Sequence, residues 1–320
     1  MGSSTADLSV IVPCLNAEAT LADALDSALN QTAPPREILL VDDGSRDRSV
    51  EIARSFGPVI RVLRNPSRGP GAARRIAVEQ AQGRYIAFVD ADDLLTGDKH
   101  ERQLAVLESR GPHTLVHTGA TVFTDDPAKT MPRQTGGELA VGRCTQLVFE
   151  RNPVCGASTM LARSVILELG NYDADLFGTE DFGMSLAAST CCDFVHLPEP
   201  LYLIRRHQNN VTNRTAHMVY HHWLAQERFR RNFPAAFGRI PEASVRQFMI
   251  EPVLRAAREA YWRREPRDYR RLLQLALRLD PSDPGIRMLW RRRWCPLGLL
   301  RVWDRVGSRL RPESAGSAPQ

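Results

Sequence analysis

The sequence predicts an α/β fold: a mostly parallel sheet with helices on both faces, followed by a C-terminal helical extension. Three observations predict it. Short apolar runs alternate with segments of helical periodicity through roughly the first ninety residues. Three of those runs lead directly into polar turns. From residue 216 on, the pattern is helical and rich in arginine.

The predicted elements follow one another in strict alternation. We expect parallel strands over Leu8–Val12, Glu37–Val41 and Val59–Leu63, and in the apolar run that starts at Tyr85. Apolar residues at helical spacing predict helices after Leu21, around Ala53 and over Ala72–Ala81. Because crossovers between parallel strands are right-handed, the strand ends should share one edge of the sheet.

After this point the pattern is looser. We expect a helix over Lys99–Leu107, a strand over Thr114–Phe123 and a polar loop over residues 124–142, whose length is typical of lids or acceptor contacts. Two short edge strands are predicted at Phe194–Leu197 and Leu201–Ile204.

Length and composition limit the class of protein. A chain of 320 residues, 43% of them hydrophobic, can form one large or two modest domains with an ordinary core. The six cysteines lack the spacing of a zinc site, so we expect reduced thiols and a cytoplasmic protein. The first residues are too polar for a secretory signal, and no stretch approaches the ~20 apolar residues of a membrane span.

Charge is unevenly distributed along the chain. Residues 201–320 carry 24 arginines and only 10 acidic residues, while the rest of the chain is net acidic. Trp290 lies among several of these arginines. Such a region can contact the inner face of an anionic membrane or a phosphate-rich acceptor. Solvated helix faces that pack their tryptophans on the catalytic domain would give the same composition, so both interpretations stay open.

The turn after the fourth predicted strand concentrates negative charge in Asp90, Asp92 and Asp93. Open α/β sheets bind ligands at the carboxyl ends of their strands. Carboxylates this close repel one another unless a cation joins them, which favours Mg²⁺ or Mn²⁺ carrying substrate phosphates. A solvated turn or a helix cap would use the same residues. The glycine fingerprint of dinucleotide folds and the Walker lysine are both absent.

Three segments carry a resemblance to a known family. Ser-Val-Ile-Val-Pro-Cys-Leu-Asn, Glu-Ile-Leu-Leu-Val-Asp-Asp-Gly-Ser-Arg-Asp and Gly-Arg-Tyr-Ile-Ala-Phe-Val-Asp-Ala-Asp-Asp resemble the hallmark segments of family 2 glycosyltransferases. The resemblance covers about residues 1–210 and implies the Rossmann-like GT-A fold. The expected domains are then a catalytic domain, an Arg-rich helical region and a tail that is disordered by composition. Their predicted ranges are 1–215 (nucleotide-sugar half 1–95, acceptor half 96–215), 216–311 and 312–320.

The resemblance also implies a donor site. Pro13 and Asn16 would line the pocket of the base and ribose, and Asp43 would accept a hydrogen bond from the base, usually uracil. Arg74 stands where the family has an arginine near the nucleotide phosphates, and Asp90 would lie beside the ribose and the metal. Leu15 replaces the aromatic residue usual in the family, which predicts weaker stacking on the base.

Metal binding and proton transfer are implied for four further residues. Asp92 matches the metal ligand of the family's D-x-D motif, and His207 is similar to a histidine that completes the metal shell; an exposed loop histidine is the alternative. Asp181 matches the general base and Glu180 would position it. Acids at a helix N-terminus are favoured by the helix dipole in any case, so a capping role stays open.

The resemblance therefore predicts an inverting, metal-dependent, hexosyltransferase-type enzyme. It would move a single sugar from a nucleotide sugar, with a UDP-sugar favoured, to a hydroxyl of a glycan or lipid-linked acceptor in surface polysaccharide or glycan assembly. A sugar nucleotidyltransferase is the first alternative, but residues 13–20 lack the basic Gly-rich loop it needs. A non-catalytic module that binds membrane or nucleic acid is the second, and the acidic set disfavours it; no nucleic-acid partner is expected.

Overall fold

The structure is a computed structural model that describes residues 5–124, 126–132, 138–206, 215–263 and 266–293. The chain divides into two compact units, the first ending at Pro252 and the second beginning at Val253. The helical region predicted from residue 216 on is therefore shared between the two units.

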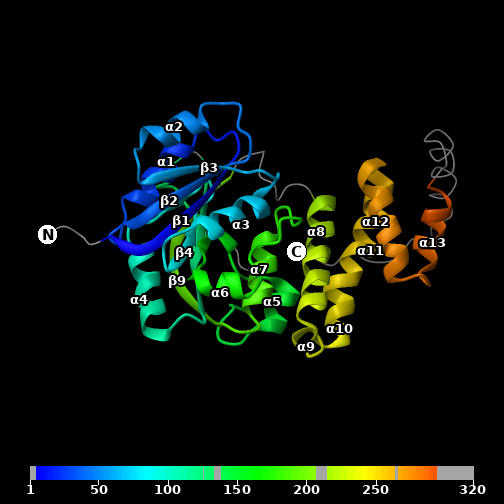
Figure 1. The fold of residues 1–320 in the computed structure, drawn as a ribbon. Coiled ribbons are helices and arrows are strands. Elements are labelled where there is room, and N and C mark those ends of the chain that lie inside the picture. The colour runs from blue at the N-terminus through cyan, green and yellow to red at the C-terminus, as the bar shows by residue number, and fades with distance from the viewer. Residues whose placement is uncertain (1–4, 125, 133–137, 207–214, 264–265, 294–320) are drawn as a thin grey trace. The chain divides into compact units, whose positions relative to one another are not determined.

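The first unit is built on one mixed sheet (Figure 1). Its strands in the described chain are β1 (Ala6–Cys14), β2 (Pro35–Asp42), β3 (Ile60–Arg64), β4 (Tyr85–Phe88), β5 (Leu94–Leu95), β6 (Thr114–Phe123), β7 (Met131–Pro132), β8 (Met160–Ala162) and β9 (Asp193–Arg205). The order is β3-β2-β1-β4-β8-β6-β9-β5, with β7 paired to β6. Strands β3, β2, β1 and β4 are parallel, as the alternating pattern predicts, and β8 runs antiparallel to β4.

Helices cover both faces of this sheet. Those of the first unit are α1 (Leu21–Leu29), α2 (Ser49–Ser55), α3 (Pro70–Gln80), α4 (Lys99–Arg110), α5 (Thr145–Arg151), α6 (Arg163–Glu168), α7 (Glu180–Ala188), α8 (Thr215–Asn232), α9 (Pro234–Phe237) and α10 (Glu242–Val245). A 3₁₀ turn, η1 (Gly156–Ser158), and a π-helical turn, η3 (Arg246–Ile250), complete it. Helix α1 packs on α2, whereas α3, α6 and α7 pack on one another. Helix α8 packs on α7, which extends the first unit past the boundary predicted near residue 215.

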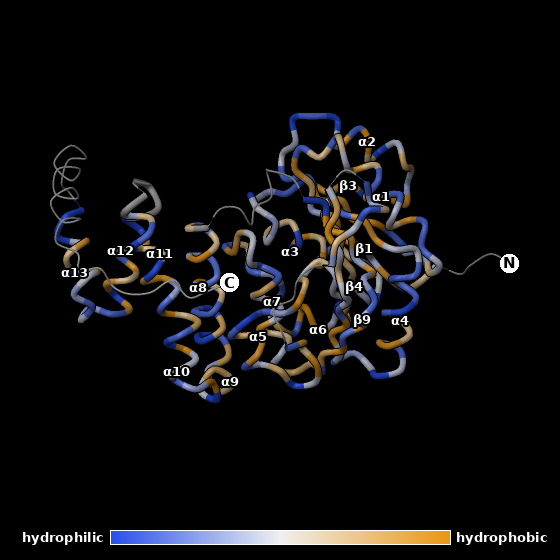
Figure 2. Tube along the Cα trace, turned by 180° about the vertical axis from the view of Figure 1, so that it is seen from behind, coloured by the Kyte–Doolittle hydropathy of each residue, from blue (hydrophilic) through white to orange (hydrophobic). Residues whose placement is uncertain are grey.

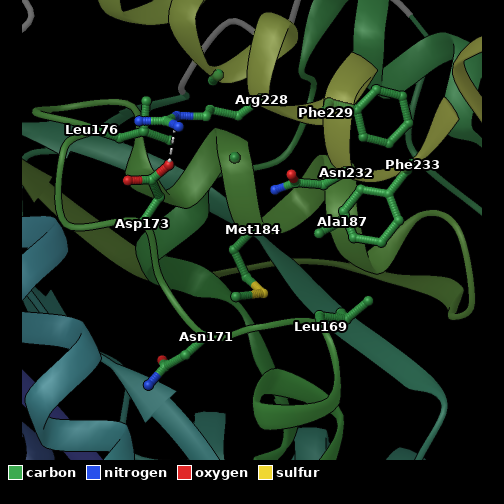
Figure 3. Close-up of a pocket in the computed structure, with 12 residues that line it drawn as sticks. Leu169, Asn171, Asp173, Leu176, Met184, Ala187, Arg228, Phe229, Asn232 and Phe233 are labelled. Atoms are coloured by element: carbon green, nitrogen blue, oxygen red, sulfur yellow. Dashed lines mark ion pairs between the residues drawn. The ribbon is translucent and has the colours of Figure 1, made fainter.

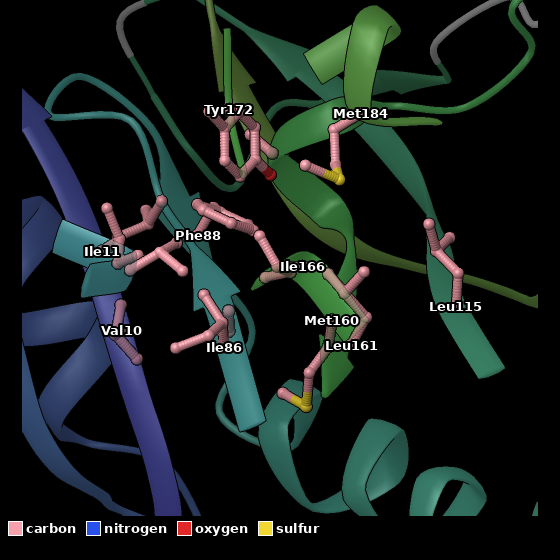
Figure 4. Close-up of a cluster of buried hydrophobic side chains, with 14 of the residues drawn as sticks. Val10, Ile11, Ile86, Phe88, Leu115, Met160, Leu161, Ile166, Tyr172 and Met184 are labelled. Atoms are coloured by element: carbon pink, nitrogen blue, oxygen red, sulfur yellow. The ribbon is translucent and has the colours of Figure 1, made fainter. Parts of the chain in front are cut away.

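The core runs along the central strands. The run from Val10 to Val12 in β1 is fully buried, because helices cover the sheet on both sides. Figure 2 shows the hydrophobic residues that follow β1 through the sheet. In Figure 4, Phe88 of β4 approaches Tyr172, with ring centroids 5.5 Å apart in an edge-on arrangement. This packing fixes the strands whose ends carry the acidic turns.

The prediction of two edge strands near residues 194–204 is wrong. The structure has one strand, β9, which lies between β6 and β5. Its register with β6 shifts around Gly119, where an added Cβ would lie 2.6 Å from the carbonyl oxygen of Pro198. The Pro-Glu-Pro sequence interrupts the hydrophobic pattern, but the irregular pairing absorbs the interruption without ending the strand.

The second unit contains the helices α12 (Pro266–Leu279) and α13 (Pro284–Arg291), while α11 (Glu251–Arg263) begins just before the boundary. Leu273 of α12 and Ile286 of α13 are buried, and α12 packs on α13. Asp283 caps α13 by accepting a hydrogen bond from the Ile286 amide and pairs with Arg258. None of the described helices has the length and hydrophobicity that crossing a bilayer requires. The predicted tail, 312–320, lies outside the described residues.

Candidate functional site

Backbone pairing brings the predicted turns to one edge of the sheet. The Asp43 amide donates to the carbonyl of Cys14 at 2.8 Å, and the Val89 amide donates to the carbonyl of Ile11 at 3.2 Å. The turns that follow β1, β2 and β4 are therefore neighbours, as the parallel order requires. Pro13 and Asn16 lie at the end of β1, Asp43 follows β2, and Asp90 and Asp92 follow β4.

Asp43 lies in a closed hydrogen-bond network. Its carboxylate accepts from the Asn65 side-chain amide at 2.6 Å and from the Gly69 amide at 3.0 and 3.1 Å. Gly69 has a φ of 103° and precedes the first turn of α3. A glycine is favoured there because other residues rarely adopt positive φ. The network fixes both the predicted base-binding acid and the start of the helix that carries Arg74.

Asn16 holds the neighbouring turn in place. Its backbone has a φ of 52°, and its side-chain oxygen accepts from the Arg46 amide at 2.8 Å. Its own amide donates to Ser45 Oγ at 3.0 Å. The residue thus ties the turn after β1 to the turn after β2. Leu15 beside it is 52% exposed, which is unusual for a leucine and leaves an apolar side chain at this edge.

Arg74 links the two predicted halves of the catalytic domain. Its guanidinium is almost fully buried and pairs with Asp90 at 2.8 Å through Nη2 and with Glu180 through Nη1. Glu180 is also buried and lies at the first turn of α7. Burial works against the charged form of Arg74, but the negative charges of Glu180 and Asp90 outweigh it and raise the pKa of Arg74.

Burial raises the pKa of two acids in this cluster. For Glu180, burial raises the pKa to about 7. The positive charge of Arg74 lowers the pKa, and the negative charge of Asp181 raises it further. The pKa of Asp90 is also raised by burial, Arg74 opposes this, and the charges of Asp92 and Asp181 add to it. Arg74, Asp90 and Glu180 are therefore coupled through the contacts of the Arg74 guanidinium.

Asp181, the predicted general base, is held by local contacts. It follows Glu180 in the first turn of α7, and its Oδ1 accepts from the Phe182 amide at 2.7 Å. Its carboxylate lies against Gly156 of η1, where an added Cβ would come within 1.9 Å of Asp181 Oδ2. Only a glycine leaves room for this side chain. The sequence gives no signal for Gly156, because the contact joins residues 25 positions apart in the chain.

Two of the acids at this edge are of the kind that a divalent cation prefers. Asp90 and Asp92 offer the carboxylate oxygens that Mg²⁺ and Mn²⁺ prefer. Within the described residues, no group of three or more His, Cys, Asp or Glu side chains is arranged to hold a metal ion. One or two carboxylates with substrate phosphates and water are the usual arrangement for Mg²⁺. His207, the predicted further ligand, lies outside the described residues.

A separate pocket lies between α7 and α8 (Figure 3). Met184 and Phe229 contribute to its apolar lining, and Asp173 and Arg228 lie at its edge, where they form an ion pair of 3.3 Å. Arg228 also pairs with Asp175 at 2.8 Å. These pairs fasten the loop that leads into Glu180 and Asp181 to helix α8.

The fold and the acidic edge define an α/β protein of the GT-A class. The structure resembles that of S. aureus TarS 1–349 in complex with UDP-GlcNAc, with a TM-score of 0.63 at 17% sequence identity over 94% of this chain and 92% of that one. At that identity the similarity shows the fold alone. The model of the family "Glycosyl transferase family 2" matches residues 9–169. This match spans half of the sequence, so the chain belongs to glycosyl transferase family 2.

Curated relatives are named glycosyltransferases. An uncharacterized glycosyltransferase of Haemophilus influenzae is 38% identical over 37% of this chain and 48% of its own length. The uncharacterized glycosyltransferase EpsJ of Bacillus subtilis is 31% identical over 64% of this chain and 62% of its own length. The chain therefore spans about half to three fifths of these two relatives. TuaG of B. subtilis, named a putative teichuronic acid biosynthesis glycosyltransferase, is also similar. It is 37% identical over 32% of this chain and 42% of its own length.

Proposed function

We propose that this protein transfers a single sugar from a UDP-sugar to a hydroxyl of a glycan or lipid-linked acceptor, with inversion at the anomeric carbon and dependence on Mg²⁺ or Mn²⁺. The observation that carries the proposal is the Arg74 bridge. It joins Asp90, at the end of the central strand β4, to Glu180, beside the predicted base Asp181. The bridge supports the proposal because it links the turn expected to bind the donor to the helix start that carries the expected proton acceptor.

The proposed roles come from the family resemblance, and the positions of the side chains support them. Asp43, oriented by Asn65 and Gly69, would accept a hydrogen bond from the base. Asp90 and Asp92 would hold the cation, which neutralises the diphosphate leaving group when bound. Asp181, fixed against Gly156, would accept the proton of the attacking hydroxyl. A hydroxyl that attacks opposite the leaving group gives inversion.

The family name and the neighbouring structure support the kind of donor and product. The TarS structure holds UDP-GlcNAc, and TuaG is named for teichuronic acid biosynthesis. The first title supports a nucleotide-sugar donor for this chain. The second name supports a role in polysaccharide assembly. We propose no nucleic-acid partner.

The first test is a screen of nucleotide sugars for nucleoside diphosphate release with Mn²⁺, Mg²⁺ or EDTA. Asp181→Asn should retain donor binding but lose turnover, because it removes the proton acceptor. Asp92→Ala should abolish Mn²⁺-dependent binding of UDP in calorimetric titration. Asp98→Ala is the control, since Asp98 is a surface residue paired with Arg102. Release of pyrophosphate instead of nucleoside diphosphate would replace the proposal with a nucleotidyltransferase.

We also propose that the protein works in the cytoplasm, at the inner face of the membrane. The five cysteines of the described chain are free thiols, which supports a reducing compartment. Met288, flanked by the exposed Arg287 and near Arg291, projects an apolar side chain from α13 among cations, a pattern suited to an anionic bilayer. Flotation with phosphatidylglycerol vesicles should recover the wild-type protein and less of Met288→Asp; equal recovery of both would reject α13 as a membrane contact.

A further inference from the structure

Residues of strand β9 form hydrogen bonds with the acidic turn Asp90–Asp93. The Tyr202 side chain is fully buried, and its hydroxyl accepts a hydrogen bond from the Asp90 amide at 3.1 Å. The same hydroxyl is hydrogen-bonded to the carboxyl group of Asp93. Because a tyrosine hydroxyl has one donor and can also accept, Tyr202 can donate to Asp93 while it accepts from Asp90.

Arg205, three residues further along β9, holds the other end of the turn. Its amide donates to Asp93 Oδ1 at 2.8 Å, and its Nε donates to the carbonyl oxygen of Asp92 at 2.9 Å. The Arg205 guanidinium is itself fixed, since it pairs with Asp23 of α1 at 3.2 Å and lies 4.7 Å from the ring centroid of Phe123. One strand therefore contacts three of the four residues of the turn.

Asp93 differs from the two acids before it in the sequence. It is 6% exposed, and its amide closes the turn by donating to the carbonyl of Asp90 at 3.1 Å. Its carboxylate is engaged by the Arg205 amide and the Tyr202 hydroxyl. Burial and hydrogen bonds from β9 are what an anchoring carboxylate needs, whereas a cation ligand must keep an oxygen open to the ion.

Three carboxylates within four residues repel one another, so the turn needs external contacts to keep one shape. Thr20 provides one such contact from the N-terminal end of α1, where its hydroxyl donates to the Ala91 carbonyl at 2.9 Å. Tyr202 and Arg205 provide the contacts to the other three residues.

We propose that Tyr202 and Arg205 are positioning residues for the cation, and that Asp93 is the anchor through which they act and not a cation ligand. They would hold the Asp90 and Asp92 carboxylates at the geometry that a cation and a diphosphate require. This inference rests on the proposed function, because it assumes that the turn binds Mg²⁺ or Mn²⁺ together with UDP.

The chain offers a matched pair of tyrosines for the test. Tyr202→Phe removes a hydroxyl that bonds the turn, while Tyr85→Phe removes a hydroxyl on β4 that is equally buried but has no hydrogen-bond partner among the described residues. We expect Tyr202→Phe to weaken Mn²⁺ binding in the presence of UDP by about tenfold, as loss of a contact behind a metal ligand does. Tyr85→Phe should stay within about twofold of the wild type, because no hydrogen bond is lost.

The measurement is calorimetric titration of Mn²⁺ into protein with saturating UDP, with free Mn²⁺ followed in parallel by its paramagnetic resonance signal. Thermal unfolding of both variants shows whether a change in Mn²⁺ affinity merely follows a loss of stability. UDP affinity in EDTA should be the same in all proteins, since Asp43 and Asn65 are untouched by either substitution.

A second pair of variants tests the role of Asp93 without altering the shape of the side chain. Asp92→Asn should abolish Mn²⁺ binding, whereas Asp93→Asn keeps an oxygen for the Arg205 amide and should retain affinity within about threefold. Equal loss in both would make Asp93 a ligand and overturn the inference. Equal Mn²⁺ affinity in Tyr202→Phe and Tyr85→Phe would overturn it as well. A wild-type protein that binds UDP without any Mn²⁺ dependence would overturn the proposed metal requirement and the inference together.

Discussion

Gly156→Ala should displace Asp181, because an added Cβ would clash with its side chain from the Cβ to the carboxylate. A Cβ at this position would lie 1.9 Å from Asp181 Oδ2 and 2.3 Å from its Cβ. Ordinary contact begins near 3.4 Å, so the carboxylate would have to move by about 1.5 Å. The backbone of Gly156 does not have positive φ, so alanine adds no strain of its own.

The size of the effect follows from that displacement. A shift of about 1 Å at a reacting group can cost about 100-fold in rate, so we expect kcat to fall by at least that factor. The contacts of Asp43 with Asn65 and Gly69 are remote from η1, so donor binding should change by less than about threefold. Overpacking should also lower the free energy of unfolding by about 1–3 kcal/mol.

The assay is steady-state UDP release with the best donor, together with calorimetric titration of UDP. Gly97→Ala is the matched control, since a Cβ there would meet only the Asn30 carbonyl at an ordinary 3.7 Å. Turnover of Gly156→Ala within about threefold of Gly97→Ala, with both proteins folded, would refute Asp181 as the positioned base.

Two further predictions concern the bridge between the halves. Arg74→Met should lower the free energy of unfolding by about 3 kcal/mol because it leaves Glu180 buried without its cation. Arg75→Met, which breaks only the surface pair with Glu79, should cost under about 1 kcal/mol, and equal losses would contradict the bridge. Because the pKa of Glu180 is raised from 4.5 to about 7, the native state holds this proton more tightly than the unfolded chain, so stability should fall as pH rises through that range. The test is to measure the free energy of unfolding in urea for the wild type and for Glu180→Gln between pH 4.5 and 8. The difference between the two proteins should change by up to about 3 kcal/mol over this range. If the two free energies of unfolding vary with pH in the same way, the raised pKa of Glu180 is excluded.

The parallel half of the fold was predictable because its signal is local. Each central strand is a short apolar run, and its predicted end lies within two residues of the end in the structure, next to a polar turn such as Asp42–Asp43 or Asp90–Asp93. Because the crossovers between parallel strands are right-handed, the turns at the strand ends had to lie at one edge of the sheet. Family resemblance supplied the expected roles of Asp92 and Asp181, which the residues alone could not distinguish from helix caps or solvated turns.

The contacts that complete the site were not predictable in this way. Arg74 and Glu180 are 106 positions apart, and Asp90 and Tyr202 are 112 positions apart. Periodicity shows which face of an element is buried, but it does not show which residue of a distant element meets that face. The β9 error has the same origin, because a proline-interrupted pattern predicts two strands unless the irregular pairing with β6 is known.

The charges at the rim of the sheet give a physical reason for the proposed cation. Asp90, Asp92 and Asp93 follow β4, and Glu180 and Asp181 begin α7. The Arg74 guanidinium pairs with two of these five acids, Asp90 and Glu180. Burial raises the pKa of Asp90 and of Glu180, Arg74 opposes this, and the neighbouring carboxylates add to it. In the proposed function, a nucleotide sugar would add a diphosphate to the same edge. Since these like charges repel one another, a divalent cation that enters with the donor is the simplest way to make the proposed binding favourable.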